Sequence, residues 1–152
     1  MQTKDFDEVI GMIQQEDPRY ERGAYHFVRH ALDHTLKKHA KKTQETPRHV
    51  RGQDLLEGIR EFALEQFGPL TLTVFHAWGI QACKDFGHIV FNLVDYGLLG
   101  KTEQDSLEDF ASGYDFEKAF VYPFLSTRRL EQREKAAIKG GKEAENRRAG
   151  DD

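Results

Sequence analysis

The first third of the chain carries apolar residues at helical spacing. One short run predicts a helix that begins near Phe6 and ends before Asp17, because Pro18 disfavours a helical conformation in the residue before it. A longer run predicts a second helix over residues 21–42, with apolar positions at i, i+3, i+4 and i+7. The predicted inward positions of this helix are Ala24, Phe27, Val28, Ala31, Leu32 and Thr35.

Glycine and proline divide the middle of the chain into further helices. A third helix opens near residue 51 and stops at Gly68, which a proline follows as a favourable start for the next helix. Residues 69–78 are apolar on nearly every side, which predicts a buried helix. An amphipathic helix over residues 85–96 comes next, and Gly97 is a natural left-handed stop.

These patterns predict a mainly α fold, a compact multi-helix domain over residues 1–125. The helices over residues 69–78 and 85–96, joined by a turn, resemble a helix-turn-helix unit that leads into a wing. A small hairpin near residues 100–117 would supply that wing, and we expect little other sheet. Aromatic residues between positions 114 and 124 are predicted to close the core.

The composition changes at residue 126, where charges of both signs replace apolar residues. Residues 126–152 are therefore predicted to form a charged tail outside the domain. Such a composition favours a short solvated helix to Lys139, with disorder after Gly140 and Gly141.

The length and composition of the chain limit the class of protein. A length of 152 residues suits one domain, and 38% hydrophobic residues can build its core without a metal or a disulfide. The single cysteine, Cys83, excludes an intramolecular disulfide framework. The sequence begins without a secretory signal pattern, and no apolar run approaches the ~20 residues that cross a bilayer. We therefore expect a cytoplasmic protein without a membrane partner.

Charge is distributed unevenly, although the net charge is only −4. Residues 1–51 carry ten Lys/Arg against eight Asp/Glu, and residues 127–152 carry eight against six, so each region has a net charge of +2. Residues 52–126 carry four against twelve, a net charge of −8. An acidic centre between basic flanks biases the choice of partner without determining the fold.

Three histidines, His26, His30 and His34, recur at i, i+4 and i+8 in the second predicted helix. Adjacent members lie ~40° apart around the helix axis, so any two can share a metal ion if a third ligand comes from elsewhere. The sequence has no HExxH glutamate, and Arg and Lys residues flank the histidines. A solvated basic face that repels a dication is the competing interpretation. No other cofactor is indicated.

Cations gather at the end of the second helix and in the loop after it. Residues 37–51 hold six Lys/Arg against Glu45 alone, a local net charge of +5, which could follow the phosphate backbone of RNA. The loop lacks aromatic residues for stacking on bases, and lysine also suits a helix C-terminus, so a solvated helix end is the alternative. The candidate contacts in residues 22–51 are Arg22, Arg29, Lys37, Lys38, Lys41, Lys42, Arg48 and Arg51.

The second helix of the helix-turn-helix-like pair presents a surface of the wrong sign for DNA. Its outward residues are predicted to be Lys84, Asp85, His88, Asn92 and Asp95. Contact with another protein is the better use of this surface, and Asp85, His88, Asn92 and Asp95 are the candidate binding residues. No catalytic residue is predicted, because the sequence shows neither a nucleophile elbow nor a two-carboxylate signature. Cys83 is interpreted as a small buried cysteine.

The segments DPRY…AYHFV, RHVRGQDLLEGIREFALEQFGP and WGI…YDFEKAF resemble an uncharacterised bacterial protein family of planctomycetes and verrucomicrobia. The resemblance covers residues 6–122, and the run from Arg48 to Phe120 is its most specific part. The family has no assigned activity, cofactor or substrate, so the resemblance implies no functional residue. It implies a bacterial cytosolic setting and a domain that ends near residue 125.

The leading hypothesis from the sequence is a non-enzymatic adaptor or regulatory module that binds another protein through its acidic helical centre. An RNA- or ribosome-associated factor that uses the basic face of residues 22–51 is the alternative. A metal-binding protein or enzyme that uses the histidine face is the third. The sequence leaves the oligomeric state open.

Overall fold

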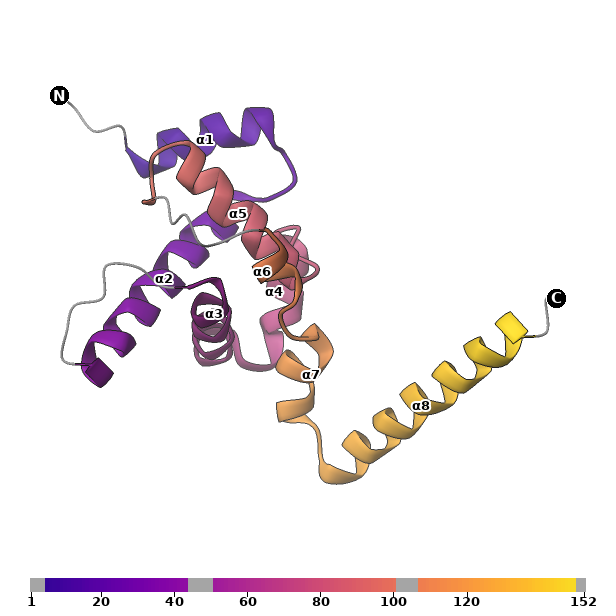
Figure 1. Cartoon of the computed structure of the whole chain (residues 1–152). Coiled ribbons are helices and arrows are strands. Elements are labelled where there is room, and N and C mark those ends of the chain that lie inside the picture. The colour runs from indigo at the N-terminus through magenta and orange to yellow at the C-terminus, as the bar shows by residue number, and fades with distance from the viewer. Residues whose placement is uncertain (1–4, 44–50, 101–106, 150–152) are drawn as a thin grey trace.

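The computed structural model describes residues 5–43, 51–100 and 107–149, without the side chains of residues 41–43 and 141–149. The protein is mainly helical, as the sequence predicts, and no strand occurs in these residues (Figure 1). Two 3₁₀ turns, Gly68–Leu70 and Tyr122–Phe124, connect helices. The α-helices are α1 (Phe6–Glu16), α2 (Arg22–Thr43), α3 (Gly52–Phe67), α4 (Thr71–Ala77), α5 (Cys83–Asp95), α6 (Leu107–Ala111), α7 (Phe116–Phe120) and α8 (Thr127–Ala149).

The helix boundaries follow the predicted stop signals. Helix α1 ends at Glu16, directly before Asp17 and the proline. Gly68 follows α3 with a φ of 52°, and Gly97 lies beyond α5 with a φ of 76°. Both angles fall in the left-handed region that glycine adopts at low cost, so these two glycines end their helices as expected.

Helices α2 and α3 cross in close contact at Gly58. A Cβ atom at this position would lie 1.8 Å from Thr35 Oγ1, so only glycine allows the two helices to approach this closely. The Thr35 hydroxyl is buried and donates a hydrogen bond of 2.8 Å to the carbonyl of Ala31 on its own helix. Phe27, early in α2, contacts Phe62 and Phe67, late in α3, and the two helices cross at a wide angle, since Figure 1 shows α2 lengthwise and α3 nearly end-on.

The core is largely aromatic, and Phe75 of α4 lies at its centre with no exposed surface. The ring is surrounded by aromatic side chains from α2, α5 and α7 and from the end of its own helix. Such tilted and edge-to-face ring pairs add to the free energy gained from burial. The neighbouring rings, with centroid distances of 5.3–6.4 Å, are Phe27, Trp78, Phe86, Phe116 and Phe120.

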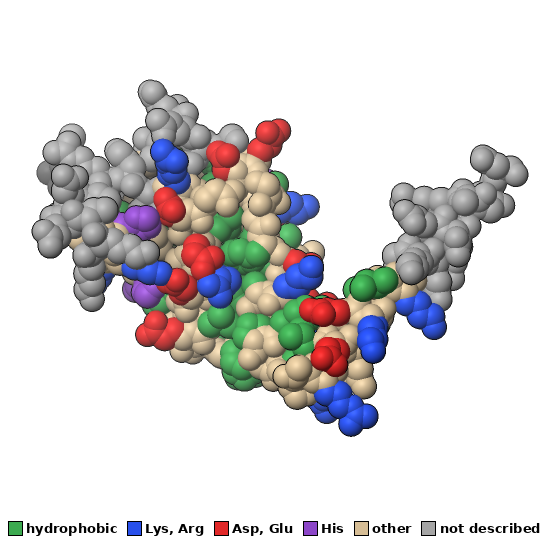
Figure 2. All heavy atoms as spheres, turned by 60° about the horizontal axis from the view of Figure 1, so that its bottom comes forward, with side chains coloured by type: hydrophobic (Ala, Val, Ile, Leu, Met, Phe, Trp, Pro, Cys, Tyr) green, Lys and Arg blue, Asp and Glu red, His purple; other side chains and the backbone are tan. Residues whose placement is uncertain are grey.

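The prediction that residues 69–78 are buried on nearly every side is wrong. Only Thr71 and Phe75 of α4 are buried, and Leu70 is 63% exposed. The helix lies at the surface of the body with one face inward, and apolar side chains gather in a band on the face that Figure 2 shows. An apolar run of this length therefore supplies exposed apolar surface as well as core.

The predictions of a hairpin and of a disordered tail also differ from the structure in the residues that it describes. Helices α6 and α7 occupy most of the described part of the region where a hairpin was expected, so no wing of strands follows α4 and α5 in that part. Residues 101–106 lie outside the described residues. The tail is helical as far as Ala149, where disorder was expected after Gly140, because two glycines lower helix propensity without forbidding a helix.

Candidate functional site

Two hollows lie along the contact between α2 and α3, and Trp78 at the end of α4 also lines one of them. Residues of α2 at 23–30 face residues of α3 at 62–67 around one hollow, and residues 35–39 face residues 54–61 around the other. The two hollows share no lining residue. The centres of the two hollows are about 10 Å apart along α3, since an α-helix rises ~1.5 Å per residue. We call the whole feature the α2–α3 groove.

The first hollow, the aromatic half of the groove, has a volume of about 270 Å³ and is lined mainly by apolar atoms. Phe27 is 4% exposed and forms its floor, because its ring contacts three other lining rings at centroid distances of 5.5–5.7 Å. Gly23 lies under the Trp78 indole, whose Nε1 is 2.4 Å from the position of a Cβ. The lining residues are Gly23, His26, Phe27, His30, Phe62, Gln66, Phe67 and Trp78.

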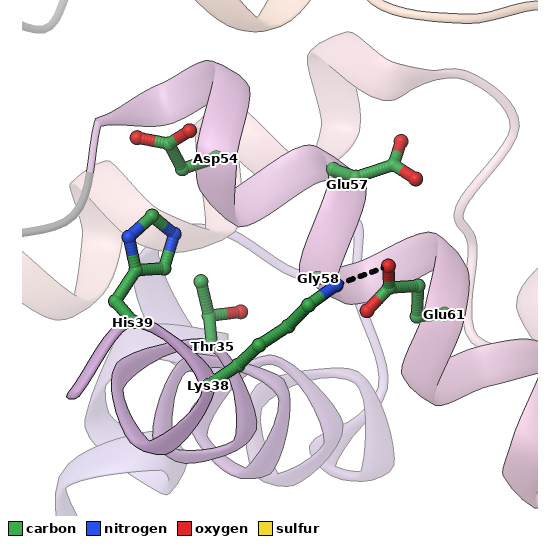
Figure 3. Close-up of a pocket in the computed structure, with 7 residues that line it drawn as sticks. All are labelled: Thr35, Lys38, His39, Asp54, Glu57, Gly58 and Glu61. Atoms are coloured by element: carbon green, nitrogen blue, oxygen red, sulfur yellow. Dashed lines mark hydrogen bonds and ion pairs between the residues drawn. The ribbon is translucent and has the colours of Figure 1, made fainter. Parts of the chain in front are cut away.

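The second hollow, the acidic half, has a volume of about 130 Å³. Thr35, Lys38 and His39 rise toward it from α2, and Asp54, Glu57 and Glu61 come from α3 (Figure 3). The hydrogen bond from the Lys38 ammonium holds the pKa of Glu61 below its ordinary value, against the opposing effect of partial burial. Glu61 therefore stays ionised at neutral pH and offers a fixed negative charge rather than a transferable proton.

A polar bridge crosses the groove between its two halves. Glu61 pairs with Lys38, and its second oxygen lies 3.7 Å from Nε2 of His34. That nitrogen is buried and has no hydrogen-bond partner in the part of the chain that the structure describes. The His34 ring packs against Phe62 at a centroid distance of 5.5 Å. The bridge therefore connects the acidic half to the aromatic wall.

Four carboxylates follow one line along α3 beside the groove. Asp54, Glu57, Glu61 and Glu65 are spaced i, i+3, i+7 and i+11, so they lie within ~80° of one another around the helix axis and span about 16 Å. Arg60 donates hydrogen bonds to Glu57. We call this line the acidic stripe. It borders the groove on the α3 side, and two of its members are paired with cations, Glu61 with Lys38 and Glu57 with Arg60.

The three histidines of the predicted metal site do not converge. His26 and His30 both line the aromatic half, and His26 Nε2 lies 2.7 Å from Asp7 Oδ1 on α1, whereas His34 faces Glu61 on α3. No group of three His, Cys, Asp or Glu side chains that could hold a metal ion occurs within residues 5–40, 51–100 and 107–140. The described geometry gives the metal hypothesis no ligand set.

Several residues of the predicted basic face are occupied by neighbours in their own chain. Arg22 donates hydrogen bonds to the carbonyl oxygen and a carboxylate oxygen of Asp7, and Arg29 stacks on the Phe6 ring at 4.4 Å. Lys38 pairs with Glu61, while Lys37 and Arg51 are exposed. The side chains of Lys41, Lys42 and Arg48 lie outside the described residues. The described part of this face is therefore less available to phosphate than the sequence suggests.

Two of the predicted protein-binding residues on α5 point inward. Asp85 is 9% exposed and accepts hydrogen bonds from the Tyr20 hydroxyl at 2.6 Å and from the amides of Gln81 and Ala82. Asn92 donates hydrogen bonds to Asp17 and to the Tyr25 hydroxyl. The outward placement predicted for both is wrong, because their polar groups hold α5 against the segment between α1 and α2. Asp95 is exposed and His88 is half-buried.

Asp17 gives this contact a pH dependence. Hydrogen bonds from Arg19, and secondarily from Asn92, hold the pKa of Asp17 well below its ordinary value of 3.8. The ionised form is therefore favoured by folding, and its stabilising contribution is present above the ordinary pKa and is lost as the pH falls below it. We expect Asp17→Asn to lose less stability than the parent chain between about pH 7 and about pH 3.

Urea unfolding at the two pH values measures this difference. Asp95→Asn, on the exposed side of α5, is the matched control and should follow the parent chain. Equal losses of stability in the parent chain and in Asp17→Asn would contradict the assignment.

The surroundings of Cys83 disfavour its thiolate form. Burial raises the pKa of its thiol to about 11, and its Sγ lies 3.4 Å from the carbonyl oxygen of Tyr114 as a hydrogen-bond donor. The thiolate is therefore scarce at neutral pH. The structure confirms the interpretation of Cys83 as a small buried residue.

The aromatic half of the groove was missed from the sequence. Phe62 falls three residues after Ile59, so helical spacing places it at the edge of the buried face of α3. Trp78 was assigned to a buried helix. Nothing in the spacing of either residue indicates that they flank the same hollow, because they come together only when α3 and the end of α4 both pack against Phe27 of α2.

Comparison of the chain with protein-family models, with curated proteins and with solved structures found no match. The bacterial family resemblance therefore stays an expectation. None of the helices in the described residues combines the length and apolar character needed to span a membrane. The function has to be argued from the groove itself.

Proposed function

We propose that the protein is a protein-binding module and that the α2–α3 groove holds a helical segment of its partner. One observation carries the proposal: an open aromatic hollow and a line of four carboxylates lie side by side on the same pair of helices. Apolar hollows with aromatic walls accept anchor side chains, and charges around them select partners by complementary sign. The partner segment is therefore an amphipathic helix with a basic face.

The spacing of the groove defines the segment further. A helix lying parallel to α3 meets the acidic stripe with cations at some of the positions i, i+3, i+7 and i+11. The aromatic half lies on the α2 side of that stripe, level with the midpoint of Phe62 and Gln66. Each residue of a helix turns ~100° and rises ~1.5 Å. Position i+10 of the facing helix therefore lies at the height of the aromatic half and on the same side of the stripe. An isoleucine or leucine at i+10 is the expected anchor.

Trp78 provides a direct readout, because it is the only tryptophan of the chain and lines the aromatic half. The full chain would be titrated with a synthetic helix of about four turns that carries lysines at i, i+7 and i+11 and isoleucine at i+10. We expect a saturable change in Trp78 fluorescence that weakens as salt is added. Replacing the lysines with glutamates should abolish the change.

Two variants test whether the peptide binds in the groove or elsewhere on the surface. Phe62→Ala removes one wall and should weaken binding by about tenfold or more. Leu70→Ala removes an exposed apolar side chain that does not line the groove, and should bind like the parent chain. No saturable response to the lysine peptide, or an equal response from Phe62→Ala, would overturn the proposal.

A further inference from the structure

Helix α8 extends away from α2 and α3 (Figure 1). Leu130 is half-buried near the root of the helix, and residues 131–140 are exposed. Arg133 pairs with Glu117 of α7, which fixes the start of the helix to the body. Ile138 is 62% exposed, so α8 presents a large apolar side chain that its own chain does not cover.

Three of the cations of α8 lie on one side of the helix, and Glu131 lies ~40° from the nearest of them, Lys135. Arg128, Lys135 and Lys139 are spaced i, i+7 and i+11 and therefore form one line within ~40° around the axis. Glu134 lies more than a quarter turn away from this line. Ile138 occupies position i+10 of the same series. The described part of α8 thus has the arrangement of cations and anchor that the groove requires.

The match extends to individual positions. When α8 is laid parallel to α3, Arg128 falls opposite Asp54, Lys135 opposite Glu61 and Lys139 opposite Glu65 in a single register. The same register places Ile138 midway between the levels of Phe62 and Gln66, on the side of the aromatic half. A helix whose charges followed another period could not place three cations opposite carboxylates and an apolar residue beside the aromatic half in one register.

One position of this register brings like charges together. Glu131 falls opposite Glu57, but Arg60 already donates hydrogen bonds to Glu57 and supplies a cation there. The pairing therefore loses one favourable contact without placing two uncompensated carboxylates against each other.

From this complementarity we infer that the partner segment is α8 of a second copy of the chain, lying parallel to α3 in the α2–α3 groove. The inference rests on the proposed function, because it names the occupant of the same groove. A second copy is required, since α8 leaves its own body in the direction away from its own groove (Figure 1). Exchange of the two α8 helices fills both grooves of the pair.

Sedimentation equilibrium of the full chain over a concentration series tests the inference. We expect reversible dimers that dissociate more readily at high salt. Ile138→Asp should weaken dimerisation about tenfold or more by placing a charge in the aromatic half. Ala137→Asp adds the same charge ~100° around the axis from Ile138 and ~180° from Arg128, and should dimerise like the parent chain. Both residues are exposed, so neither variant disturbs the fold of the body.

An exchange of charges tests the register. Glu65→Lys and Lys139→Glu should each weaken self-association, because like charges then face each other in both halves of the dimer. An equimolar mixture of the two variants restores opposite charges in both halves and should dimerise like the parent chain. A structural defect in either variant would not be repaired by mixing.

A chain that stays monomeric at all concentrations would overturn the inference, as would equal effects of Ile138→Asp and Ala137→Asp. The same experiments test the proposed function separately. If the chain is monomeric but Trp78 responds to the synthetic lysine helix, the groove binds another protein and only the choice of occupant is wrong. If Trp78 does not respond and no dimer forms, both proposals fail.

Discussion

Phe75→Ala is expected to lower the free energy of unfolding by about 3–5 kcal/mol, the cost of truncating a fully buried aromatic side chain. The Phe75 ring has no exposed surface and contacts five other aromatic rings, so its removal leaves a cavity that the surrounding helices cannot easily fill. Two of its neighbours, Phe27 and Trp78, also line the aromatic half of the groove. The substitution should therefore weaken ligand binding as well as stability.

Chemical denaturation with linear extrapolation measures the first effect, and Trp78 fluorescence measures the second. Leu70→Ala is the control from the same segment of the chain. Leu70 is 63% exposed, so this substitution should change the free energy of unfolding by about 0.5 kcal/mol or less. A loss of less than about 1 kcal/mol in Phe75→Ala would show that the core is not organised around this ring.

Asp85→Ala is expected to lower the free energy of unfolding by about 2–4 kcal/mol. The substitution removes the acceptor of three hydrogen bonds, and it leaves the Tyr20 hydroxyl buried without a partner. The free amides of Gln81 and Ala82 at the start of α5 lose their acceptor as well. Hydrogen bonds to a charged group cost more to remove than neutral ones, which places this effect above that of an ordinary surface substitution.

Asp95→Ala, at the exposed end of the same helix, tests whether the acidic residues of α5 bind a partner or whether Asp85 stabilises the fold. If α5 binds a partner through its acidic residues, both substitutions should weaken partner binding. If Asp85 acts through the fold, Asp85→Ala lowers the unfolding midpoint while the folded chain still responds to the synthetic lysine helix. We expect the second result. Equal stability of the two variants would contradict the network around Asp85.

Elements that depend on neighbouring residues alone were predicted well. The ends of α1, α3 and α5 follow from the proline after Asp17 and from Gly68 and Gly97, because these residues act on the backbone beside them. The mainly α class follows from the helical period of the apolar residues. The apolar stretch before Gly79 misled the prediction, since periodicity cannot tell how much of a short apolar helix a neighbour covers.

The candidate site could not be predicted from the sequence, because it depends on contacts between residues that lie far apart in the chain. Asp85 and Asn92 have the polar character of surface residues, but Tyr20, Asp17 and Tyr25 turn them inward from far away in the sequence. The groove arises from the close crossing of α2 and α3 at Gly58, which no local pattern of either helix indicates. The uneven charge and the spacing of the acidic stripe are visible in the sequence, whereas the aromatic hollow beside the stripe is not.

The measurement closest to the central claim is a map of backbone amide shifts by NMR when the lysine helix is added to the full chain. Binding in the groove predicts that the largest changes fall on both its walls, at Gly23 and His30 of α2 and at Phe62 and Gln66 of α3. Amides on the outer side of α5, including Asp95, should stay unchanged. Changes confined to α5, or spread evenly over the surface, would contradict the assignment of the α2–α3 groove as the binding site.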